Sequence, residues 1–123
     1  AGLKRLGLSD RIAYRFSPEE LVPAAGQGIL AIQTRAGEYA DLLARLNSPD
    51  GALCAKTERQ LASLLGGDCS APVGCHAQLH GTDMTLYGFS GIGGVPRCGS
   101  VQGNRNDADL LVQQLASKLT ITE

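Results

Sequence analysis

The chain has 123 residues, of which 43% are hydrophobic and 4% aromatic, and its formal net charge is −1. Enough apolar side chains are present to form one packed core, which excludes a disordered chain. The small net charge excludes a nucleic-acid binder built on bulk positive charge, and no apolar run is long enough to span a membrane.

The first 23 residues contain two short, interrupted elements. "GLKRLGL" places leucines at nearly helical spacing, and Gly7 suits the C-terminal end of a short helix. "SPEE" at 17–20 carries a helix-start pattern, in which Ser17 caps and Glu20 answers the cap. Because Pro23 follows so soon, we expect a turn or a single helical turn there.

Residues 24–47 are predicted to contain one strand and one helix. The Gly-Gln-Gly at 26–28 lacks the strand-before, helix-after context of a phosphate loop, so it predicts a tight turn. Residues 29–32 are then expected to form a buried strand. Residues 38–46 follow the spacing of a helix with one apolar face, formed by Tyr39, Leu42, Leu43 and Leu46.

A longer helix is predicted to begin after Ser48, which suits an N-cap, with Pro49 at the first helical position. Gly66 and Gly67 are expected to end it. Its inward stripe is expected to consist of Leu53, Thr57, Leu61, Leu64 and Leu65. The neighbouring Glu58 and Arg59 are interpreted as a solvated ion pair on this helix.

Three strand-like runs and a final helix complete the chain. The runs cover residues 73–81, 84–91 and 97–103, and the first two alternate between the faces of a sheet. A last helix begins at Asn106 or Asp107, with Leu111, Val112, Leu115 and Leu119 facing inward. Short connections between the strands predict an antiparallel three-stranded sheet with helices on one face, an α+β fold.

The four cysteines are Cys54, Cys69, Cys75 and Cys98. Two disulfides are one interpretation, but the chain lacks the character of a small secreted protein, so reduced thiols are favoured. A zinc site would have to combine Cys69, Cys75, His76 and Cys98. Their spacing lacks the paired C-x2-C pattern of structural zinc sites, so no metal is predicted.

Cys69 lies in "LGGDCSAPV", after the end of a predicted helix and beside Asp68. The negative end of the helix dipole and the adjacent carboxylate both disfavour the thiolate, and no histidine precedes it as a base. A Cys-His hydrolase is therefore disfavoured. Two interpretations stay open: a structural cysteine, or an attachment point for a strongly electrophilic group that needs no activated thiol.

Basic side chains at Lys4, Arg5, Arg11 and Arg35 also have two interpretations. They are either solvated surface charges or part of a site that binds carboxylates, for which the arginine fork is suited. Composition does not decide between them.

Three stretches, together with the spacing between them, resemble one family. "AGLKRLGL", "LVPAAGQGILAIQTR" and "KTERQLASLLGGDCSAPVG" are similar to the C-terminal part of porphobilinogen deaminase, also called hydroxymethylbilane synthase. The resemblance covers residues 1–90, and residues 91–123 fit the family more loosely. No single stretch is specific, but several in the right order are.

The resemblance implies a three-domain fold, with two α/β domains flanking an active-site cleft and a small third domain. Residues 1–23 then correspond to the end of domain two and residues 24–47 to a segment crossing back to domain one. Residues 48–123 correspond to the third domain, a three-stranded antiparallel sheet with helices on one face. The chain also begins Ala-Gly-Leu without a methionine, so we expect a processed chain or a piece of a longer one.

The resemblance also implies the chemistry. The family condenses four porphobilinogen molecules with loss of ammonia and releases hydroxymethylbilane in tetrapyrrole and heme biosynthesis. A dipyrromethane cofactor primes the chain through a thioether to a cysteine, whose position Cys69 occupies. Arg5 matches a family arginine that holds substrate carboxylates. Gln27 and Gly28 match the loop that lies against the cofactor.

Two departures from the family pattern limit this carry-over. Asp68 stands between the glycine pair and the cysteine, where the family usually reads Gly-Gly-Cys. The family's catalytic aspartate belongs to domain one, so no catalytic residue is predicted here and this chain alone is expected to be inactive.

The full-length enzyme is expected to be a cytoplasmic monomer that binds no nucleic acid or membrane. The partners expected for this chain are porphobilinogen, the growing pyrrole chain and the missing N-terminal domains. The alternatives are a non-catalytic α+β module with structural cysteines and, less favoured, a zinc-binding module.

Overall fold

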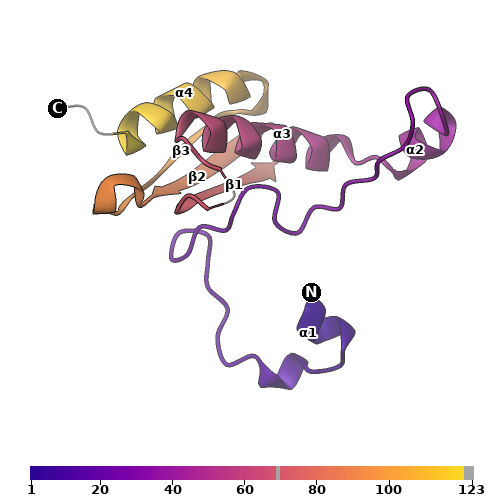
Figure 1. Cartoon of the computed structure of the whole chain (residues 1–123), viewed down its shortest axis with the longest axis horizontal. Coiled ribbons are helices and arrows are strands. Elements are labelled where there is room, and N and C mark those ends of the chain that lie inside the picture. The colour runs from indigo at the N-terminus through magenta and orange to yellow at the C-terminus, as the bar shows by residue number, and fades with distance from the viewer. Residues whose placement is uncertain (69, 121–123) are drawn as a thin grey trace.

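The computed structural model describes residues 1–68 and 70–120 of the chain (Figure 1). Its helices are α1 (Gly2–Arg5), α2 (Ala40–Leu46), α3 (Pro49–Leu64) and α4 (Ala108–Leu119). Its strands are β1 (Val73–His80), β2 (Asp83–Ser90) and β3 (Arg97–Asn104). Three short 3-10 turns complete the set, η1 (Ser9–Arg11), η2 (Ile92–Gly94) and η3 (Arg105–Asp107).

The three strands form one antiparallel sheet in the order β1-β2-β3, with Cys75, Gly88 and Gly99 opposite one another. Helix α3 packs over β1, and α4 packs over β2 and β3. Figure 1 shows both helices on the same face of the sheet. The predicted α+β fold, with a three-stranded antiparallel sheet and helices on one face, is therefore confirmed.

Local signals set both ends of α3. The Ser48 hydroxyl accepts a hydrogen bond from the Gly51 amide at 3.1 Å, so it caps the helix as predicted. At the other end, Gly66 takes the left-handed conformation with φ +77°, and the Gly67 amide donates to the Ala62 carbonyl at 2.8 Å. This is a Schellman motif, which turns the chain sharply away from the helix axis.

The core lies between the sheet and the two long helices. On β2, Met84, Leu86, Gly88 and Ser90 are buried, which confirms the predicted alternation. The buried apolar residues are Leu61, Leu65, Cys75, Ala77, Met84, Leu86, Ala108, Leu111, Val112, Leu115, Ala116 and Leu119.

One member of the predicted α3 stripe is misplaced. Leu64 is 46% exposed, and the prediction that it faces inward was wrong. It lies on the flank of α3 toward α4, where it lines a surface hollow together with Val112. Leu61 and Leu65 occupy the sheet-facing positions instead.

The region before α3 is extended and lacks a core of its own (Figure 1). The strand predicted at 29–32 is absent from this described stretch, and Leu30 is 95% exposed. A strand needs a hydrogen-bonded neighbour, and none lies beside these residues. The predicted helix is present as α2, but Tyr39, Leu42 and Leu46 of its apolar face are exposed.

The "SPEE" pattern forms a turn and not a helix. The Glu20 amide donates to the Ser17 hydroxyl at 3.3 Å, and the Ser17 amide donates to the Glu20 carboxylate at 3.1 Å. The Tyr14 hydroxyl also donates to that carboxylate, at 2.8 Å. The capping pattern was therefore identified correctly, and the chain leaves the turn before a helix can grow.

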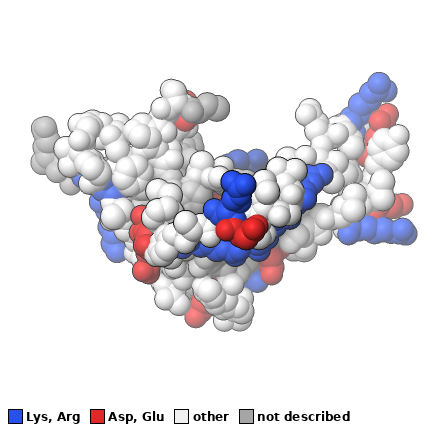
Figure 2. Space-filling view, turned by 90° about the horizontal axis from the view of Figure 1, so that it is seen from below, with Lys and Arg blue, Asp and Glu red and all other residues white. Residues whose placement is uncertain are grey.

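Charged side chains of both signs are interspersed over the face seen in Figure 2. This distribution agrees with the small net charge of the sequence. In the described part of the chain, no helix combines the length and the apolar character needed to cross a membrane.

Candidate functional site

The loop between α3 and β1 contains the cysteine singled out from the sequence. Cys69 itself lies outside the described residues. On one side of it, Gly67 has no room for a side chain, since a Cβ there would lie 2.7 Å from Val73 Cγ2 and 2.8 Å from the Ala62 carbonyl oxygen. A tight turn between α3 and β1 therefore requires glycine at this position.

Asp68 folds back onto the residue that follows the cysteine. Its Oδ1 accepts hydrogen bonds from the Ser70 amide at 2.9 Å and from the Ser70 hydroxyl at 2.7 Å. The Ser70 hydroxyl, followed by its amide, holds the pKa of Asp68 below its ordinary value. Both residues are exposed.

The turn at 25–28 holds the two residues predicted to contact a cofactor. Gly26 and Gly28 have φ of +77° and +82°, values that glycine adopts without strain. Gln27 Oε1 accepts a hydrogen bond from the Ala24 amide at 3.3 Å, which closes the turn. Gln27 and Gly28 are exposed, so both are accessible to a ligand.

Glu58 is the residue that sequence reasoning misinterpreted. It is 2% exposed, so the prediction of a solvated ion pair with Arg59 was wrong. Its Oε2 accepts from the Gly26 amide at 2.8 Å, and its Oε1 accepts from the Ala77 amide at 2.9 Å. His76 Nδ1 lies 3.4 Å from Oε1, close enough for an ion pair when the imidazole is protonated.

A signal for the burial of Glu58 is present in the sequence. Cys54, Glu58, Leu61 and Leu65 follow the i, i+4, i+7, i+11 spacing of one helical stripe. A carboxylate on such a stripe is buried together with it and must find hydrogen-bond donors. Here the donors come from residues 32 positions before and 19 positions after Glu58, which no local pattern reveals.

Among the site residues that the structure describes, Arg5 is not brought together with Gln27 and Gly28. Arg5 ends α1 and is exposed, and Figure 1 shows α1 standing apart from the sheet and its helices. Gln27 and Gly28 lie in the turn beside α3 and β1, next to Gly26. The roles of Arg5, Gln27, Gly28 and Cys69 therefore stay predictions.

The three described cysteines, Cys54, Cys75 and Cys98, are free thiols. Burial, followed by the nearby Glu58 carboxylate, raises the pKa of Cys75 to about 12, so its thiol is unreactive at neutral pH. Within residues 1–68 and 70–120, no group of three or more His, Cys, Asp or Glu side chains is arranged to hold a metal ion.

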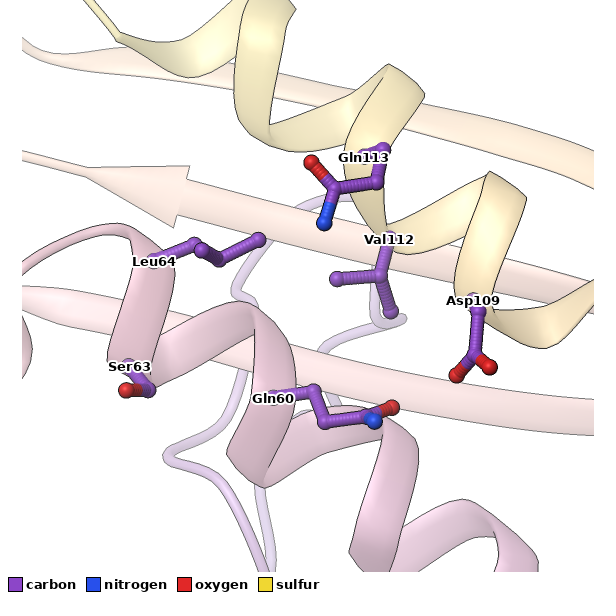
Figure 3. Close-up of a pocket in the computed structure, with 6 residues that line it drawn as sticks. All are labelled: Gln60, Ser63, Leu64, Asp109, Val112 and Gln113. Carbon is purple, nitrogen blue, oxygen red and sulfur yellow. The ribbon is translucent and has the colours of Figure 1, made fainter.

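The surface of the described residues includes two hollows. One, of about 470 Å³, lies between α3 and α4 (Figure 3) and is lined by Gln60, Ser63, Leu64, Asp109, Val112 and Gln113. It offers amides and one carboxylate but no nucleophile paired with a base. The other, of about 170 Å³, lies over β2 and β3 and is lined by Glu19, Val22, Tyr87, Cys98, Gly99 and Ser100.

Comparison with known proteins gives a consistent result along the chain. Residues 1–42 match the family model described as "Porphobilinogen deaminase, dipyromethane cofactor binding domain". Residues 52–120 match the model described as "Porphobilinogen deaminase, C-terminal domain". The chain belongs to the porphobilinogen deaminase family. The resemblance predicted from the sequence is therefore confirmed, and the second match contains the loop with Asp68 and Cys69.

Individual relatives agree with the family models. Porphobilinogen deaminases of Thiobacillus denitrificans and Chromobacterium violaceum are 43% and 45% identical to the chain over 123 aligned residues. The alignments include 97% of this chain but 40% of each relative. The enzyme of Ruminiclostridium josui is 38% identical, with 42% of its length included. The chain thus corresponds to the C-terminal portion of porphobilinogen deaminases, about two fifths of their length.

Proposed function

We propose that this chain is the part of a porphobilinogen deaminase that anchors the dipyrromethane primer, and that Cys69 forms the thioether to it. The full-length enzyme then acts as a transferase that joins four porphobilinogen molecules, releasing ammonia at each addition, and yields hydroxymethylbilane for tetrapyrrole synthesis. The bound dipyrromethane supplies the pyrrole end from which the new chain is built.

The observation that carries this proposal is the pair of family matches, one that ends before α3 and one that begins within it, together with the position of the cysteine loop. The matches cover residues 1–42 and 52–120, so both the cofactor-binding domain and the C-terminal domain of the family are represented. Cys69 lies within the second match, between exposed residues Asp68 and Ser70.

The residues beside Cys69 suit a point of permanent attachment and not a catalytic nucleophile that is regenerated in every cycle. Asp68 is engaged by Ser70 through two hydrogen bonds, so its carboxylate braces the loop. A carboxylate beside the thiol and the nearby C-terminal end of α3 both disfavour the thiolate. An azafulvene, the electrophile left when ammonia departs from the pyrrole, would need no such activation. Sulfur would bond to its exocyclic methylene carbon, the electrons of the exocyclic double bond would move toward the ring nitrogen, and that nitrogen would take up the thiol proton.

Arg5, Gln27 and Gly28 complete the proposed site. The arginine fork suits the acetate and propionate carboxylates of the pyrrole rings. Gln27 and Gly28 are exposed in the turn at 25–28 and are free to contact the cofactor. Since Arg5 stands apart from the sheet, we expect the missing N-terminal domains to be needed before these residues converge, and the chain alone to be inactive. From the family resemblance we also expect a cytoplasmic, monomeric full-length enzyme.

The test uses the full-length protein that contains this chain. Intact-mass measurement is expected to find dipyrromethane attached at Cys69, with a colour reaction to Ehrlich's reagent. Cys69→Ala is expected to abolish both the adduct and the formation of hydroxymethylbilane, whereas Cys98→Ala, at an exposed cysteine, is the matched control and is expected to keep both.

An active enzyme without the adduct, or activity that survives Cys69→Ala, would overturn the proposal. If Cys69→Ala affects only stability in a protein that never carries the adduct, the alternative of a non-catalytic α+β module with structural cysteines is the correct one.

A further inference from the structure

Glu58 has a feature that the anchoring role does not explain. Its side chain is almost fully buried in the middle of α3, where a carboxylate is costly unless donors surround it. Both oxygens accept a backbone amide, from Gly26 at 2.8 Å and from Ala77 at 2.9 Å. Hydrogen bonds to a charged acceptor are stronger than those between neutral groups. The Glu58 side chain therefore connects α3 firmly to the turn at Gly26 and to β1.

The amide of Ala77 belongs to the outer edge of β1. Because β1 is an edge strand, its outward amides have no neighbouring strand to pair with. The connecting segment of residues 22–26 covers part of this edge, where the Pro23 carbonyl accepts from the Cys75 amide at 2.8 Å. Glu58 then satisfies the next outward amide, that of Ala77.

Close packing provides a second point of attachment. A Cβ on Gly74 would lie 2.6 Å from the carbonyl oxygen of Val22, so the segment lies directly against β1 at this glycine. The attachment of residues 22–26 to the α+β unit therefore depends on a polar contact at Glu58 and a steric fit at Gly74.

We propose that Glu58 is a positioning residue that fixes the turn carrying Gln27 and Gly28 on the unit that carries Cys69. The Gly26 amide that it holds lies directly before Gln27 in the chain. Helix α3, on which Glu58 lies, also ends in the turn that leads to Cys69. The attachment of residues 22–26 stands on contacts alone, whereas its consequence for the cofactor rests on the proposed function.

The attachment is tested on the 123-residue chain by amide hydrogen exchange and by the proton–nitrogen NMR signal of Gly26. Glu58→Gln keeps the shape of the side chain, but its amide nitrogen cannot accept a hydrogen bond, so one of the two backbone amides loses its acceptor. We expect exchange across residues 22–28 to accelerate about tenfold or more and the Gly26 signal to shift, with β2 and β3 unchanged.

Two pairs of variants make the test specific. Glu38→Gln, the same change at an exposed site, is expected to leave residues 22–28 unaffected. Gly74→Ala leaves Glu58 intact but pushes Val22 away, so it is expected to accelerate the same residues. Gly99→Ala is its control, because a Cβ there makes an ordinary contact 3.6 Å from Leu115.

Unchanged exchange at residues 22–28 in Glu58→Gln, or equal acceleration throughout the chain, would overturn the positioning role. If Glu58→Gln does not fold, Gly74→Ala tests the attachment of residues 22–26 to β1. Unchanged amide exchange at residues 22–28 in Gly74→Ala would overturn that attachment.

In the full-length protein, the adduct measured by intact mass connects the attachment to the cofactor. We expect Glu58→Gln to lower the fraction of Cys69 that carries dipyrromethane, with Glu38→Gln unchanged. Full occupancy in Glu58→Gln would overturn its role toward the cofactor. A wild-type protein with no adduct would instead contradict the proposed function and leave the exchange result intact.

Discussion

Residues 49–119 and residues 1–47 differ in where they put their apolar side chains. In the first region, leucines from one stripe of each of α3 and α4 pack against the sheet, and Leu61, Leu115 and Met84 are fully buried. In the second region Leu6, Phe16, Leu21, Leu30 and Ile32 are exposed, although apolar residues are no rarer there.

This contrast shows that regularly spaced apolar side chains become buried only where the element that they pack against is present. Residues 49–119 contain both the helices and the strands that those helices cover. Residues 1–47 are fixed mainly where residues 22–26 contact β1 and Glu58. Many large apolar side chains are exposed in residues 1–47, and we expect the remainder of the full-length protein to cover them.

The largest difference in unfolding free energy between the two regions is expected from truncating one leucine to alanine in each. Leu61→Ala empties a fully buried site and is expected to lower the free energy of unfolding by about 2–5 kcal/mol. Leu30→Ala, at a side chain that is 95% exposed, is expected to change it by less than about 0.5 kcal/mol. Urea unfolding of the 123-residue chain followed by circular dichroism measures both. Equal losses would show that residues 1–47 have a core as well.

A smaller difference is expected from adding one methyl group to a glycine in each region. Gly67→Ala forces a Cβ against Val73 and the Ala62 carbonyl and is expected to cost about 1–3 kcal/mol of unfolding free energy. Gly2→Ala adds a Cβ that meets nothing within 4 Å, so no loss is expected. The same urea titration compares the two, and a neutral Gly67→Ala would contradict the tight turn described before Cys69.

The smallest effect on stability is expected from replacing two exposed carboxylates whose pKa values are lowered, Asp68 and Glu20. Ser70 lowers the pKa of Asp68, and Tyr14 followed by Ser17 lowers that of Glu20. A lowered folded-state pKa contributes stability above the unfolded pKa of about 4, and this contribution is lost as the pH falls through the folded value. Asp68→Asn is therefore expected to destabilise slightly at pH 7, with the difference from wild type vanishing at low pH.

Glu20→Gln is the matched control for the titration of Asp68. It is expected to leave cooperative unfolding unchanged at every pH, because residues 1–47 contribute little to the core that unfolds. Thermal unfolding from pH 2 to 7 measures both variants. A larger effect of Glu20→Gln than of Asp68→Asn would reverse the comparison between the regions.

Much of the α+β unit could be predicted because its signals are local. Ser48 and Pro49 marked the start of α3, and Gly66 and Gly67 marked its end, since capping depends on residues within one helical turn. The alternation along β2 and the stripe of α4 were also predicted correctly, because the partner faces lie in the same unit. Cys69 was selected through its family motif, and its anchoring role is a proposal.

The family, the α+β class and the limits of α3 could be predicted from the sequence, because they depend on local patterns and on motifs in order. The fold was needed to show that residues 29–32 form no strand and that Glu58 is buried. A strand exists only beside a hydrogen-bonded neighbour, and a buried carboxylate only where donors converge. The donors for Glu58 come from Gly26 and Ala77, which only the folded chain brings together.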